Sequence, residues 1–118
     1  MVLMSSAFAQ AEKDGWKEMD LFHTYMAATF HPADEGNLEP LKAKADSLYL
    51  VAKLWQDSPI PSDFKAAKTK LALQNLVAKC ASIKKMVTAK ASNGQLKKEI
   101  TEAHEIFHHI MGECKKGE

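Results

Sequence analysis

Five histidines lie in two short stretches near opposite ends of the chain. His23 and His31 belong to the first stretch, and His104, His108 and His109 belong to the second. His104 and His108 are four residues apart, so on a helix both imidazoles leave from the same face. Such a pair makes a bidentate clip for zinc or copper. The histidines therefore predict transition-metal chemistry, provided that the two stretches meet in the fold.

The first two helices must position the earlier histidines. We expect a helix over about residues 15–30 that ends at His31-Pro32, because a residue before proline avoids the α region. Its apolar face has 4-3-4 spacing and consists of Met19, His23, Met26 and Phe30. After the loop, Asn37 is the predicted cap of a second helix, and Pro40 lies in its tolerant first turn. The apolar positions of the second helix are Leu38, Leu41, Ala45, Leu48, Ala52 and Trp55.

Two further helices follow the Ser58-Pro59-Ile60-Pro61-Ser62 break. Ser62 or Asp63 is the predicted cap of the third helix, and Ser92 with Gln95 has the capping-box spacing that begins the fourth. The third helix buries a heptad-like row of Leu73, Leu76, Cys80, Ile83 and Val87. The fourth presents Leu96, Ile100, His104, Phe107, Met111 and Cys114.

These elements predict an all-α protein, an antiparallel up-down-up-down four-helix bundle. Short loops make consecutive helices antiparallel, and amphipathic helices of this length must bury their faces against one another. The 118 residues suit one domain, which we place at residues 11–118. Residues 1–10 read as the end of a signal peptide or as a helical extension, with Ala7-Phe8-Ala9 as an A-x-A cleavage site. Export to a periplasm is the expectation.

The predicted topology makes the first and last helices neighbours. Reflecting positions across the turns places His31 level with His104, and His23 and Met26 near His108. Because buried imidazoles without partners are costly, we expect them to share a metal ion in the bundle interior. The predicted ligands are His23, His31, His104 and His108, with Glu35 as a possible fifth.

The ligand types favour zinc, with copper or iron as alternatives. Glu39 and Glu105 are candidates for orienting the imidazoles, while His109 is expected to point into solvent. The segment from His104 to His108 matches H-E-x-x-H, but a compact bundle lacks the open cleft of a metalloprotease. A di-iron carboxylate site is also disfavoured, because only Glu105-x-x-His108 matches its motif.

Composition excludes several other functions. With 16 basic and 15 acidic residues the chain has a net charge of only +1, which argues against binding to nucleic acid. No apolar run reaches the roughly 20 residues of a transmembrane helix. Cys80 and Cys114 form no haem-attachment motif, and the register places them about two turns apart, too far for a disulfide.

About half of the chain resembles the soluble periplasmic b-type cytochrome and its cytochrome c-prime relatives. The resemblance lies in Ser58-Pro59-Ile60-Pro61, the Ser92-Asn93-Gly94-Gln95 turn and the pair Phe107-His108. It implies an exported four-helix bundle, and it implies haem b held between Met26 and His108. The additional histidines would crowd a porphyrin, so the sequence favours a bare metal ion.

The leading hypothesis is therefore an exported metal-binding bundle, with binding, sensing or storage of the ion favoured over catalysis. The alternatives are a b-type haem electron-transfer protein and a structural or interaction bundle without a cofactor.

Overall fold

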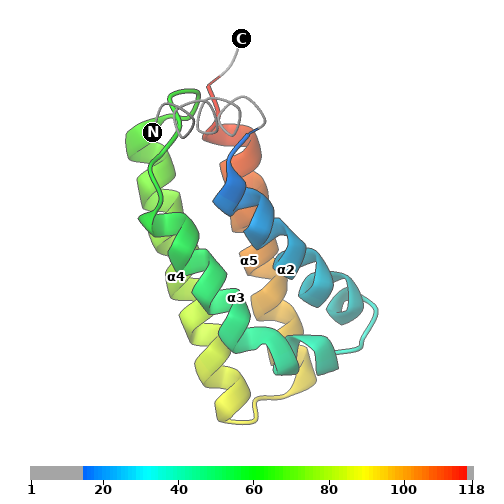
Figure 1. Cartoon of the computed structure of the whole chain (residues 1–118). Coiled ribbons are helices and arrows are strands. Elements are labelled where there is room, and N and C mark those ends of the chain that lie inside the picture. Colours follow the sequence, from blue (N-terminus) through cyan, green and yellow to red (C-terminus); the bar gives the residue numbers. More distant parts are fainter. Residues whose placement is uncertain (1–14, 117–118) are drawn as a thin grey trace, which may run out of the picture.

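The computed structural model describes residues 15–116, which form four long helices (Figure 1). They are α2 (Lys17–Asp34), α3 (Glu39–Asp57), α4 (Ala66–Thr88) and α5 (Asn93–Glu113). Each helix packs against the next along the chain, and α2 also packs against α5. The predicted all-α, up-down-up-down bundle is confirmed. The predictions for residues 1–10 lie outside the described residues.

An aromatic cluster fills the core where α2, α3 and α5 meet. The ring of Trp55 lies 5.4 Å from Phe22, 5.8 Å from Phe107 and 5.6 Å from Trp16. All four rings are at most 3% exposed. Burying a side chain of this size contributes roughly 1.5–3 kcal/mol, so this cluster is a main source of stability.

The predicted faces of α3, α4 and α5 are largely confirmed, whereas that of α2 is rotated. All six predicted apolar positions of the second helix are buried, Leu38 at its cap and the other five within α3. In α2 the buried residues are Phe22, Met26, Thr29 and Ala33. The rotation arises because Phe22 joins the aromatic cluster, which moves His23 to the edge of the core. The helix therefore directs His23 outward rather than inward.

The predicted end of the first helix was four residues too early. α2 continues through Pro32 to Asp34, because burial of Ala33 holds its last turn against the core. The carbonyl oxygen of Pro32 accepts hydrogen bonds from the N–H groups of Glu35 and Asn37. These bonds satisfy the helix end that proline would otherwise disturb. His31 is consequently a helical residue and not part of a loop.

The helix starts agree with the predicted caps in one case and differ in two. Ser92 and Gln95 form the predicted capping box, with bonds of 3.2 Å and 3.1 Å. Asn37 does accept from the N–H of Glu39, although the cap position is Leu38.

The third predicted cap was wrong because α4 begins at Ala66, after Ser62 and Asp63. There the chain pairs with the C-terminal segment: the N–H of Lys65 donates to Cys114 and that of Lys116 donates to Asp63. This pairing seats the buried Phe64 ring against Trp16. Cys80 and Cys114 are both free and buried, which confirms the absence of a disulfide between them.

Candidate metal centre

Two of the three histidines of α5, His104 and His108, form a close pair on the side of the helix that faces α2. The Nε2 atoms of His104 and His108 are 3.2 Å apart. At this distance the Nε2–H of one neutral imidazole can donate a hydrogen bond to the Nε2 of the other, in a direction set by the tautomers. Two nitrogens bound to one tetrahedral zinc at about 2.0–2.1 Å would be roughly 3.3–3.4 Å apart. The pair therefore has nearly the spacing that a single ion requires, and we call it the His104–His108 clip.

Phe30 of α2 holds one ring of this clip in place. The rings of Phe30 and His104 are parallel within 6°, with centroids 3.8 Å apart. Sequence reasoning assigned Phe30 to the core, but it is only partly buried and supports His104 instead. The sequence signal for this contact was that Phe30 directly precedes His31, which the predicted register places level with His104. The stack fixes the plane of His104 and leaves its Nε2 directed toward His108.

The environment of His104 favours the neutral imidazole, which is the form that binds metal. Partial burial lowers the pKa of His104, and the nearby charges of His108 and His31 lower it further. The carboxylates of Asp34 and Glu105 act in the opposite direction with smaller effect. Because a lowered pKa makes protonation of this ring less favourable, protons compete less with a metal ion for its lone pair.

The remaining predicted histidines lie along the same α2–α5 seam. His31 follows Phe30, with ring centroids 5.7 Å apart, and is close enough for its charge to act on His104. His23 lies 5.2 Å from the ring of Phe107, which is 5.9 Å from that of His108. We call His23, His31, His104 and His108 the histidine row.

The predicted burial of the histidine row was wrong. His23, His31 and His108 are exposed and His104 is partly buried, because Phe22, Met26 and Phe107 occupy the core at this level. Within residues 15–116 the side chains of His, Cys, Asp and Glu form no group of three arranged to hold a metal. The structure thus brings His104 and His108 together. Participation of His23, His31 and the exposed Glu35 stays a prediction.

The proposed axial residues for haem lie in different environments. Met26 is 1% exposed within the core, whereas His108 is exposed on the surface of α5. In the core where α2, α3 and α5 meet, the ring centroids of Phe22, Trp55 and Phe107 lie 5.4–5.8 Å apart. Haem stays a prediction that no feature of this packing favours.

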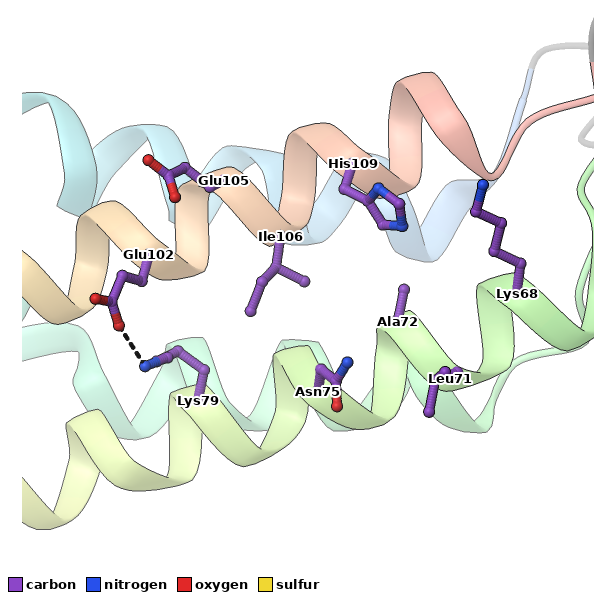
Figure 2. A pocket seen from close by; sticks show the side chains of 9 residues that line it. All are labelled: Lys68, Leu71, Ala72, Asn75, Lys79, Glu102, Glu105, Ile106 and His109. Atoms are coloured by element: carbon purple, nitrogen blue, oxygen red, sulfur yellow. Dashed lines mark hydrogen bonds and ion pairs between the residues drawn. The ribbon is translucent and has the colours of Figure 1, made fainter.

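The other side of α5 carries different chemistry. His109 is exposed, as predicted, and lines a groove of about 500 Å³ between α4 and α5, with Lys68 and Ala72 opposite it (Figure 2). Glu105 lines the same groove and therefore does not face the clip as a metalloprotease base would. His109 provides a matched surface histidine on the same helix as the clip.

An ion-pair network closes one end of this groove and was not predicted. Lys79 of α4 donates to Glu99 at 2.9 Å and to Glu102 at 2.7 Å, and Lys98 binds Glu102 at 2.9 Å. The hydrogen bond from Lys79, followed by that from Lys98, lowers the pKa of Glu102 to about 2. The 98–102 spacing was a sequence signal for one pair, but the link to α4 depends on packing.

Comparisons of the chain with protein-family models, with curated proteins and with solved structures gave no match. The resemblance to periplasmic cytochromes therefore stays a prediction beyond the four-helix architecture. Within the described helices, none is both long and apolar enough to cross a membrane.

Proposed function

We propose that this bundle binds a transition-metal ion on the face between α2 and α5. The His104–His108 clip supplies two nitrogen ligands, and His31 supplies a third after a change of its rotamer. Water completes the coordination. The observation that supports this most directly is the 3.2 Å separation of the two Nε2 atoms, one of them fixed by stacking on Phe30. Because His108 is exposed, an ion bound at the clip can exchange with the solution. We propose binding and exchange of the ion rather than catalysis, since Glu105, the general base of an H-E-x-x-H site, lines the groove on the other side of α5.

Zinc is the probe for this proposal, because it binds nitrogen ligands without redox chemistry. The purified protein is dialysed against a chelator and then titrated with zinc by calorimetry. We expect one equivalent to bind. The double substitution His104→Ala, His108→Ala should weaken binding by about 10–100-fold or more, the loss that even supporting groups cause at metal sites.

His109→Ala is the matched control, since it removes an exposed histidine from the same helix without touching the clip. It should leave zinc affinity unchanged. Equal affinity of the wild type and the double variant would overturn the proposal, as would equal losses in the double variant and the control.

Binding should also stabilise the fold, because the clip exists only when α5 is helical. Free zinc at 100 times its dissociation constant adds about 2.7 kcal/mol to the free energy of unfolding. Excess chelator should reverse the gain in melting temperature. The double variant should show neither effect, whereas His109→Ala should show both.

Export of the protein is a separate proposal and rests on Ala7-Phe8-Ala9, which lies outside the described residues. The full chain would be expressed behind a basic n-region and an apolar segment that carry no cleavage site of their own, and mass spectrometry of the secreted protein would show whether cleavage follows Ala9. Retention of residues 1–9 in the mature protein would contradict the proposal.

A further inference from the structure

Two methionines continue the donor row beyond the histidines. On α5, Met111 lies seven residues after His104 and three after His108, so all three share the face directed toward α2. On α2, Met19 precedes His23 by one turn. Both methionines are partly buried and pack against the edge of the core.

The aromatic contacts between α2 and α5 determine which residues lie level. Phe107 of α5 contacts both Phe22 and His23 of α2, with centroids 5.6 Å and 5.2 Å apart. The helices are antiparallel, so one turn back along α2 and one turn forward along α5 are again level. Those positions are Met19 and Met111. The methionine pair therefore adjoins the level of His23 and His108 on the same seam.

We infer that the ion bound by this seam is copper(I), held by the His104–His108 clip together with the thioether sulfurs of Met111 and Met19, which take the coordination positions that His31 and water occupy around zinc. The inference rests on the proposed function and adds the identity of the metal. Thioethers are soft, neutral ligands that select copper(I) and contribute little to zinc binding. Methionine is also unbranched and flexible, so its sulfur can turn toward an ion by a change of rotamer.

Cys80 and Cys114 carry soft donors that could compete with these methionines, but both side chains are buried. Cys80 is 1% exposed and Cys114 is 0% exposed. Burial raises the pKa of the Cys80 thiol to about 12, so this side chain stays protonated at neutral pH. Soft-metal binding to the native protein should therefore depend on the methionines and not on these thiols.

The test compares copper(I) and zinc affinity in the full chain and in Met19→Leu, Met111→Leu. Copper(I) is supplied anaerobically with a chromophoric competing chelator, and zinc is titrated by calorimetry. Leucine keeps the volume of methionine and is well tolerated in packing, so the variant should fold. Met86→Leu is the matched control, since Met86 is a partly buried methionine on α4, away from the seam.

We expect the double leucine variant to lose about tenfold or more in copper(I) affinity, the loss typical of a removed supporting group. Its zinc affinity and that of Met86→Leu should remain at the wild-type value. Copper(I) binding that is unchanged in the leucine variant, or that is lost instead in Cys114→Ala, would overturn the inference while zinc binding at the clip still stands. If the wild type binds neither zinc nor copper(I), the proposed function itself fails.

Discussion

Phe107 connects the hydrophobic core to the histidine row. Its substitution by alanine should lower the free energy of unfolding more than any substitution at the surface. The side chain is 1% exposed and touches four rings, those of Phe22, Trp55, His23 and His108, at 5.2–5.9 Å. Removing a buried phenylalanine ring costs about 3–5 kcal/mol, since the cavity cannot fully close. That loss is a large share of the roughly 5–15 kcal/mol that stabilises a domain.

The measurement is urea unfolding followed by far-UV circular dichroism, with chelator present so that metal binding does not contribute. Phe107→Leu keeps most of the volume and loses the ring contacts, so it should cost about 1–2 kcal/mol. Leu71→Ala is the control, because Leu71 is 59% exposed and should change stability by less than about 0.5 kcal/mol. A cost for Phe107→Ala no larger than that of the control would refute this account of the core.

Three further predictions concern the helix cap, the ion-pair network and the cysteines. Ser92→Ala should cost about 1 kcal/mol by removing the capping box, whereas Ser62→Ala should be nearly neutral in the same urea assay, because α4 begins later. The pKa of Glu102 is lowered from 4.5, its value in the unfolded chain, to about 2 in the folded protein. The ionised carboxylate therefore stabilises the fold fully above pH 4.5, and this stabilisation is lost as the pH falls from 4.5 toward 2. Unfolding measured across this pH range should show a shallower decline for Glu102→Gln than for wild type, and an identical decline would contradict the network. Neither Cys80 nor Cys114 should react with a thiol reagent until denaturant is added, and rapid labelling of the native protein would show that their burial is wrong.

The architecture could be read from the sequence because local signals and apolar periodicity agree. In α3 the 3-4 spacing from Leu38 to Trp55 names the buried face correctly, and Ser92 with Gln95 marks the start of α5. Such features depend on residues within one or two turns of each other.

The two wrongly predicted helix boundaries, the end of α2 and the start of α4, have a common cause. Burial of Ala33 extends α2 past Pro32, and pairing with the C-terminal segment delays α4, and both are contacts between distant parts of the chain.

The candidate site was predicted in part for the same reason. The 104–108 spacing identifies the clip, because both residues belong to one helix. Helical periodicity did not show that Phe22 rather than His23 would face the core, since that choice depends on the rings of Trp55 and Phe107. Nor did it reveal that Phe30 stacks on His104. Sequence spacing thus predicts pairs on one helix, whereas exposure is decided by packing between helices.

The location of a bound ion tests the central claim most directly. Crystals of the full chain grown with equimolar zinc would be measured at the zinc absorption edge for anomalous difference density. We expect one strong peak about 2.0–2.1 Å from Nε2 of both His104 and His108. A peak at His109 or elsewhere, or an empty clip beside fully ordered imidazoles, would contradict the account.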